Sequence, residues 1–166
     1  MTFTTTESNP ALVKAFQSLD TDQQLALFLF VYTEMGESVT PAAPGASTVS
    51  SEIAESLFEQ VKGMSQDEQL QIQRDLIARK NNLIAREYGA LSDTTKLLFW
   101  YLLAQGMDNG SVVPMPQDYQ LTDSAQQVFS QIKQLEFNQQ ITLFRDIVGP
   151  MGVDPNSAQQ DSQTGL

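Results

Sequence analysis

Three side chains in one segment of the sequence have types and a spacing suited to gripping a flat apolar molecule. Trp100, Ala104 and Met107 follow the i, i+4, i+7 pattern of one helix face. The small alanine leaves a slot between an indole and a thioether, and both of these groups are polarizable. Such a surface favours dispersion contacts with a conjugated hydrocarbon. Other aromatic residues that could add rings to it are Tyr32, Tyr101 and Tyr119.

The sequence lacks the side chains that most enzymes use. It contains no Cys and no His, which excludes thiolate chemistry, Ser-His-Asp triads and the usual nitrogen and sulfur metal ligands. Paired carboxylates, Lys or Tyr remain as catalytic groups, but the acidic residues fall mostly on the polar faces of the expected helices, as solvated side chains do. Gly106 and Gly110 lack the context of a phosphate-binding loop. We therefore expect a binding protein and not an enzyme.

Charge and hydropathy narrow the class of partner. The chain has 20 acidic and 9 basic residues, a formal charge of −11, which repels nucleic acid. Its longest apolar runs, Leu25–Tyr32 and Leu97–Ala104, fall well short of the roughly 20 residues of a membrane span. The N-terminus, Met1–Glu7, has no signal-peptide pattern. These features predict a cytoplasmic protein with no membrane span and no nucleic-acid partner.

The two apolar runs allow two interpretations. An uninterrupted apolar run covers every face of a helix, so each run must be surrounded. Neighbouring helices alone could surround them, or the runs could line a tunnel with apolar contents. Arg145 is equally open. It interrupts the apolar stripe of Ile141, Phe144 and Val148, and it is either a site residue or a surface cation near a helix C-terminus.

Helical periodicity and capping residues predict an all-α protein. Asn9-Pro10 is typical of an N-cap followed by the first helical residue. Ser65–Glu68 and Asp20–Gln23 both fit a capping box, and Ser92 and Thr122 mark two further starts. No run alternates with period two for long enough to form a strand. The expected helices are 10–19, 22–35, 52–63, 66–79, 82–89, 93–108, 123–134 and 137–148.

Loops and ends divide the chain. Gly36–Ser51 contains two prolines among small residues, which forbids a long helix there. Asn109–Pro116 is a second irregular stretch, and Gly149-Pro150 ends the last helix. We expect one domain over residues 1–152 and a disordered polar tail over residues 153–166.

Part of the sequence recurs with a constant shift of 116 residues. A two-helix element used at both ends of the chain, as two similar halves packed together, would explain the recurrence; a chance match is the alternative. Leu19, Gln23, Gln24, Leu25, Leu27, Phe28, Met35 and Gly36 recur as Leu135, Gln139, Gln140, Ile141, Leu143, Phe144, Met151 and Gly152.

Seven short motifs occur in order between about residue 20 and residue 152. They are Gln24-Leu25-Ala26-Leu27, Tyr32-x-Glu34-Met35-Gly36, Ala42-Ala43-Pro44-Gly45-Ala46, Phe99-Trp100-Tyr101, Met107-Asp108-x-Gly110, Val113-Pro114-x-Pro116, and Gln139-Gln140-Ile141-Thr142 leading to Arg145. With these motifs the chain resembles the helical N-terminal domain of the orange carotenoid proteins of cyanobacteria. It is more similar still to the free-standing helical carotenoid proteins.

The resemblance implies two interleaved four-helix bundles that form one domain around a non-covalently bound ketocarotenoid. Canthaxanthin is the first expectation for that pigment, and echinenone and 3′-hydroxyechinenone are the alternatives. Carried over by matching position, the implied pigment contacts are Leu25, Phe28, Leu29, Tyr32, Val39, Gln73, Trp100, Tyr101, Ala104, Met107, Met115, Tyr119, Ile141, Thr142, Arg145 and Val148.

Three positions depart from the pattern of the two-domain members. Leu29 stands where those members have a Trp ring contact, and Gln73 and Arg74 stand where they usually have Met and Cys. These changes bear on ring packing, on the depth of the pigment and on its colour. They leave the implied tunnel open.

The resemblance further implies photoprotection, in which the protein supplies a dry tunnel and the carotenoid quenches singlet oxygen. Constitutive quenching of the phycobilisome antenna is an alternative that would bring the protein to the thylakoid surface, although the charge of −11 disfavours docking on an acidic antenna. A carotenoid carrier, which would exchange pigment with a separate homologue of the C-terminal domain, is another alternative. A pigment-free helical scaffold is the fourth hypothesis.

We expect no photoswitch. In the two-domain members a second domain covers part of the pigment and separates on illumination, and the polar tail expected here is too short to form that domain. Thr94 stands where those members carry an Asn that meets the second domain, and Arg145 occupies the position of their interdomain salt-bridge Arg. A switch needs two states, and the state in which a second domain covers the pigment has no counterpart expected in this chain.

Overall fold

Capping residues start the helices where the sequence predicts. Asn9, Ser92 and Thr122 each accept a hydrogen bond of 3.2 Å from the backbone N–H three residues further on, and Ser65 and Glu68 form a reciprocal capping box. The computed structural model describes residues 9–35, 48–114 and 119–153, and within them the chain is all helical, with eight α-helices and no strand. The helices are α1 (Pro10–Gln17), α2 (Thr21–Met35), α3 (Thr48–Lys62), α4 (Gln66–Ala78), α5 (Leu83–Gly89), α6 (Asp93–Asn109), α7 (Asp123–Gln134) and α8 (Phe137–Val148).

One helix begins earlier than the sequence suggests. α3 starts at Thr48, inside the segment predicted as a loop, so the predicted start at residue 52 is wrong. The last helix breaker of that segment is Gly45, and nothing in the backbone chemistry after it prevents the helix from extending back to Thr48. Residues 36–47, which contain both prolines, lie outside the described residues.

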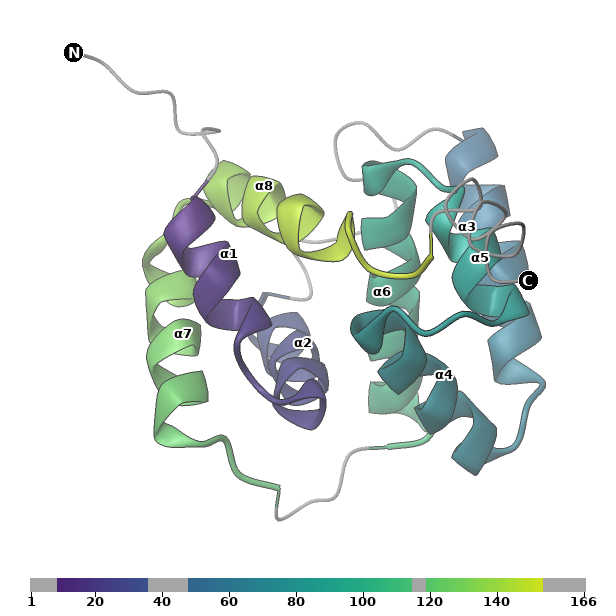
Figure 1. Cartoon of the computed structure of the whole chain (residues 1–166), viewed down its shortest axis with the longest axis horizontal. Coiled ribbons are helices and arrows are strands. Elements are labelled where there is room, and N and C mark those ends of the chain that lie inside the picture. Colours follow the sequence, from purple (N-terminus) through teal and green to yellow (C-terminus); the bar gives the residue numbers. More distant parts are fainter. Residues whose placement is uncertain (1–8, 36–47, 115–118, 154–166) are drawn as a thin grey trace, which may run out of the picture.

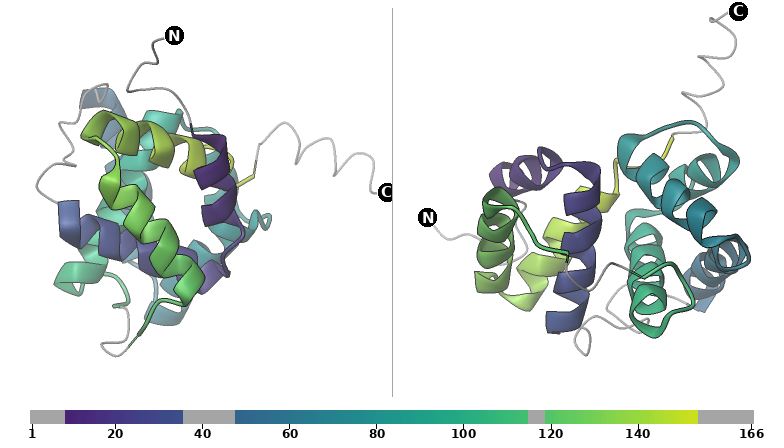
Figure 2. Two further views of the ribbon diagram at one scale, coloured as in Figure 1. Left: turned by 90° about the vertical axis from the view of Figure 1, so that its left-hand side faces the viewer. Right: turned by 90° about the horizontal axis from the view of Figure 1, so that it is seen from below.

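The helices form two bundles of four. The chain begins in the first bundle, builds the whole of the second, and then returns to the first. The first bundle comprises α1, α2, α7 and α8, and the second comprises the consecutive helices α3–α6 (Figure 1). They meet through the pairs α2–α6, α6–α8 and α2–α4. Seen from below, α2 and α6 face each other across the junction (Figure 2). The predicted fold of two interleaved four-helix bundles is confirmed.

The same type of glutamine hydrogen bond joins consecutive helices at three corners of the fold. Gln24, Gln69 and Gln140 are each the fourth residue of their helix, are buried, and donate their side-chain amide to a carbonyl near the end of the preceding helix. The carbonyl groups that accept are those of Gln17 (3.3 Å), Lys62 (3.2 Å) and Ile132 (2.9 Å). These carbonyl groups lie near helix ends, where intrahelical partners run out. Gln24 and Gln140 are related by the 116-residue shift, and the helices that carry them, α2 and α8, both belong to the first bundle.

The segment that follows α8 ties the two bundles together, and we call residues 149–153 the C-terminal strap. It leaves the first bundle and reaches the second, as the yellow trace after α8 shows (Figure 1). Gly152 donates its backbone N–H to the carbonyl of Leu76 (2.9 Å), and Val153 donates to the carbonyl of Ala85 (3.1 Å). Lys96 on α6 donates its Nζ to the carbonyl of Gly149 (2.6 Å). The described structure thus continues through Val153, one residue into the predicted tail.

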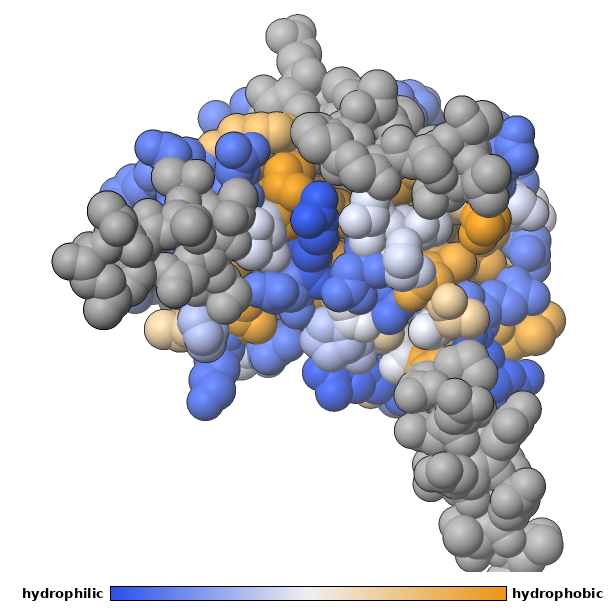
Figure 3. All heavy atoms as spheres, turned by 90° about the horizontal axis from the view of Figure 1, so that it is seen from above, coloured by the Kyte–Doolittle hydropathy of each residue, from blue (hydrophilic) through white to orange (hydrophobic). Residues whose placement is uncertain are grey.

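On the face that is seen from above, patches of apolar side chains are separated by polar and charged ones (Figure 3). In the part of the chain that the structure describes, no helix combines the length and the apolar character needed to cross a membrane. Among the side chains that the structure describes, the large apolar ones that are exposed are Ile53 on α3 and Leu83 on α5.

Candidate functional site

Two apolar pockets follow one another along the facing sides of α2 and α6, which we call the seam. The aromatic pocket has a volume of about 50 Å³ and is lined by Phe28, Val31, Tyr32, Leu97, Trp100, Tyr101, Ala104, Gln140, Ile141 and Phe144. The distal pocket has a volume of about 160 Å³ and is lined by Asp22, Leu25, Ala26, Leu70, Gln73, Arg74, Met107, Val113, Pro114 and Tyr119. Taken together, the lining residues of the two pockets extend from Asp22 to Tyr32 on α2 and from Leu97 to Met107 on α6, about 15 Å along each helix.

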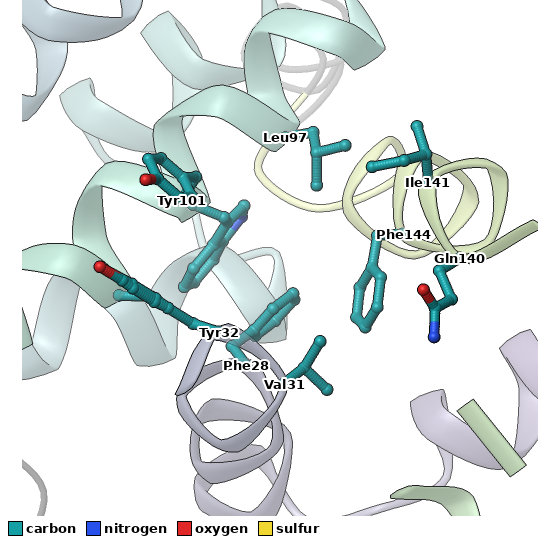
Figure 4. Close-up of a pocket in the computed structure, with 10 residues that line it drawn as sticks. Phe28, Val31, Tyr32, Leu97, Tyr101, Gln140, Ile141 and Phe144 are labelled. Carbon is teal, nitrogen blue, oxygen red and sulfur yellow. The ribbon is translucent and has the colours of Figure 1, made fainter. Parts of the chain in front are cut away.

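Stacked rings form the walls of the aromatic pocket. Phe28 on α2 and Trp100 on α6 lie nearly parallel, with ring centroids 4.8 Å apart and an interplanar angle of 8°. Tyr32 and Tyr101 form a second stacked pair across the same two helices, at 5.4 Å and 28°. Phe144 reaches the pocket from α8, tilted against Phe28 at 5.9 Å (Figure 4). The pocket therefore offers flat, polarizable faces from three helices.

A buried hydrogen-bond chain fixes the indole of Trp100. Its Nε1 donates to the hydroxyl of Tyr88 (3.0 Å), and that hydroxyl donates to the backbone carbonyl of Val148 at the end of α8 (2.6 Å). Burial keeps the pKa of Tyr88 well above its usual value near 10, with the charge of Asp93 adding to the effect and the bond from Trp100 opposing it. The phenol therefore stays protonated and holds the indole in one orientation.

The aromatic pocket carries no charge at neutral pH. Its lining residues have neutral side chains, and the pKa of Tyr32 is raised, first by burial and then by the neighbouring Tyr101 and Asp108. Across the described segments there is no group of three or more acidic side chains arranged to hold a metal ion, and the sequence has no His or Cys. The arrangement suits an elongated apolar molecule held by dispersion.

The far end of the distal pocket is polar. Arg74 on α4 donates its Nε and Nη2 to the two carboxylate oxygens of Asp22 on α2, at 2.9 and 3.0 Å. The hydroxyl of Tyr119 accepts a hydrogen bond from Nε2 of Gln23 (2.8 Å), and Oε1 of Gln23 accepts from the backbone N–H of Thr122 (2.9 Å). The ion pair joins α2 to α4, and the glutamine joins α2 to Tyr119 and Thr122, at this end of the seam.

The structure sorts the residues implied by the resemblance into four groups. Those at the aromatic pocket are Phe28, Tyr32, Trp100, Tyr101, Ala104 and Ile141. Those at the distal pocket are Leu25, Gln73, Met107 and Tyr119. Four line neither pocket: Leu29, Thr142, Arg145 and Val148. Two, Val39 and Met115, lie outside the described residues. A pigment contact at each of these positions stays a prediction.

Other lining residues are not among the pigment contacts that the resemblance implies. At the aromatic pocket they are Val31, Leu97, Gln140 and Phe144, and at the distal pocket Asp22, Ala26, Leu70, Arg74, Val113 and Pro114. The internal repeat carried a signal for one of them, because Phe144 is the counterpart of Phe28 under the 116-residue shift. Leu97 carried another, since it lies four residues before Tyr101 on the same helix face.

A family and several relatives match the chain. The model of the family described as "Orange carotenoid protein, N-terminal" matches residues 2–154. An orange carotenoid-binding domain-containing protein of Nostoc sp. is 50% identical over 143 residues, which cover 86% of this chain and 82% of that protein. The orange carotenoid-binding protein of Synechocystis sp. is 41% identical over 143 residues, and the chain spans only 44% of its length.

Solved structures agree with this match. The Red Carotenoid Protein of Anabaena (Nostoc) sp. PCC 7120, solved with canthaxanthin bound, has a TM-score of 0.76 and 55% identity, over 87% of this chain and 98% of that one. The Orange Carotenoid Protein of the same organism, also solved with canthaxanthin, has a TM-score of 0.79 and 39% identity, over 90% of this chain and 47% of that one. The family model covers the whole of the described structure, helices α1 to α8 included, and the chain belongs to the orange carotenoid protein N-terminal family.

Proposed function

We propose that the chain binds a ketocarotenoid non-covalently along the seam and protects against light damage by quenching singlet oxygen. The observation that carries the proposal is the row of two apolar pockets on α2 and α6, with two stacked aromatic pairs in its wall. Further support comes from a relative with 55% identity that was solved with canthaxanthin. When bound, the polyene supplies the chemistry, because it accepts excitation energy and releases it as heat.

The side chains of the seam hold and shield the pigment. Trp100, Phe28 and Tyr101 present ring faces that contact a conjugated chain by dispersion. Ala104 keeps space open beside the indole, and its own side chain is buried. Tyr88 fixes the indole from behind. None of these residues forms or breaks a bond, so the proposal assigns no catalytic residue.

The test is expression in a host that makes canthaxanthin. We expect the purified protein to be coloured, and to lower a singlet-oxygen phosphorescence signal far more than the same protein made without pigment. The apoprotein is the matched control, because it contains the same Trp, Tyr and Met side chains that react with singlet oxygen. A colourless product from a host shown to contain the ketocarotenoid would overturn the proposal.

Two other outcomes correspond to the alternative functions. A coloured protein that shortens the fluorescence lifetime of isolated phycobilisomes would favour antenna quenching, which the charge of −11 disfavours. A coloured protein that gives its pigment to an added carotenoid-binding protein within minutes would favour a carrier. Slow exchange together with singlet-oxygen quenching would favour the function proposed here.

We expect the pigment-loaded 166-residue chain to keep its absorption spectrum under blue light. A reversible switch needs a second state that other contacts stabilise, and the walls of the seam are held by the bonds from Tyr88 to Val148 and from Lys96 to Gly149. The measurement is a difference spectrum during illumination and after return to the dark. A shift of the absorption band with dark recovery, in this chain alone, would contradict the expectation.

A further inference from the structure

Three polar side chains separate the distal pocket from a polar hollow on the surface. Asp22, Arg74 and Tyr119 line the apolar distal pocket on one side. The same three residues line a hollow of about 460 Å³ on the other side, with Asp20, Gln71, Asp75 and Lys80 among its further residues. They therefore form a partition, which we call the polar end wall. Any molecule that fills the distal pocket meets this wall with its terminal atoms.

The end wall has hydrogen-bond donors to spare. A guanidinium group has five N–H donors, and two of those of Arg74 are used on Asp22. The hydroxyl of Tyr119 accepts from Gln23, so its own proton is available for donation. The side chains of Arg74 and Asp22 are 41% and 49% exposed, so the pair exchanges part of its hydration for contact with whatever fills the pocket.

These groups distinguish two kinds of terminal ring. A hydrocarbon ring in contact with the polar end wall removes water from the Arg74–Asp22 pair and forms no hydrogen bond with it, which is unfavourable. A ring with a carbonyl oxygen accepts from Arg74 and Tyr119, and a ring with a hydroxyl group can also donate to Asp22. Sites built around polar groups reject the analogue that lacks the matching atom more strongly than apolar pockets do.

We infer that Asp22, Arg74 and Tyr119 select pigments whose terminal ring carries an oxygen atom at the distal end of the seam. The inference rests on the proposed function and adds the determinant of pigment choice to it. Arg74 supplies the stronger contribution, because hydrogen bonds from charged donors are the stronger ones. Asp22 acts as a positioning residue, since it holds the guanidinium group in place through both carboxylate oxygens.

The test is a competition between two pigments with the same skeleton. The apoprotein is mixed with equal amounts of canthaxanthin, which has a carbonyl on each ring, and β-carotene, which has none. Bound pigment is extracted and the ratio of the two is measured by chromatography. We expect the wild-type chain to enrich canthaxanthin. Arg74→Leu should lower that enrichment about tenfold, and Tyr119→Phe about fivefold.

The matched control is Arg86→Leu, which removes the same charge from α5 at a position that lines neither pocket. It should leave the enrichment unchanged. Circular dichroism confirms folding of each variant, and Tyr119→Phe provides an independent reading because it removes a single oxygen atom. Unchanged enrichment in both Arg74→Leu and Tyr119→Phe, or equal binding of both pigments by the wild type, overturns the inference and leaves the proposed function standing. Binding of neither pigment by the wild type overturns both.

Discussion

Replacing Trp100 with alanine is expected to remove most of the bound pigment from the purified protein. The indole is 2% exposed, stacks on Phe28 and lines the aromatic pocket beside Ala104. Loss of a buried ring of this size lowers the free energy of unfolding by about 3–5 kcal/mol. In this position it also removes a surface that the pigment is proposed to contact. The measurement is the ratio of visible to ultraviolet absorbance of protein purified from a canthaxanthin-producing host.

Phe99→Ala is the matched control for this experiment. Phe99 is the preceding residue of α6, is fully buried, packs edge-on against both Tyr88 and Trp100, and does not line either pocket. Both variants are compared after normalisation for folded protein by circular dichroism. Trp100→Phe, which keeps one ring but loses the bond to Tyr88 and part of the area of the indole, should retain more pigment than Trp100→Ala. Equal loss in Phe99→Ala and Trp100→Ala would make Trp100 an ordinary core residue.

Gly152→Ala is expected to destabilise the fold by roughly 2–5 kcal/mol. Gly152 has a φ of +76°, a left-handed conformation that costs other residues about 1–2 kcal/mol. A Cβ atom there would lie 2.5 Å from the Tyr88 ring and 3.0 Å from the carbonyl oxygen of Ala85, and overpacking of this kind adds about 1–3 kcal/mol. The free energy of unfolding, measured in urea, reports the sum.

A second glycine provides the control for this change. At Gly63, just after α3, a Cβ atom would make only ordinary contacts of 3.6 and 3.8 Å with backbone oxygens. Gly63→Ala should therefore leave stability unchanged or raise it slightly. The Gly152 substitution should also weaken pigment binding, because the C-terminal strap holds the end of α8 against the second bundle. Equal stabilities of the two variants would show that the strap does not hold the bundles together.

Much of the fold follows from local patterns in the sequence. The capping residues Asn9, Ser65, Ser92 and Thr122 lie next to the helix starts, and each acts within one turn of its own position, where sequence patterns are informative. The sequence does not fix the start of α3, because Ser47, Thr48, Ser50 and Ser51 are all preferred N-cap residues and no single one of them stands out. The local sequence is compatible with a helix that starts at Thr48 but does not by itself predict that start.

Less of the site can be predicted from the sequence, because several of its contacts join residues that are far apart along the chain. Trp100, Ala104 and Met107 were found because they share one helix face. The partner of Arg74 is Asp22, 52 residues earlier on another helix, and no local pattern indicates that contact. Gln140 bonds to Ile132, only eight residues away, but its place in the lining of the aromatic pocket depends on α2 and α6, which are distant in the sequence.

The first bundle is built from both ends of the chain, and this sets the order in which the two bundles can fold during synthesis on the ribosome. Helices α3–α6 are consecutive, so the second bundle is complete once residue 109 has emerged. The first bundle needs α8, and Gln23 must wait for Tyr119 and Thr122, which follow it by 96 and 99 residues. At typical rates of synthesis this wait is on the order of ten seconds. During that interval the apolar run of α2 has been made and its neighbours α7 and α8 have not, so the nascent chain exposes the faces of α2 that the finished protein packs against α7 and against Phe144 of α8.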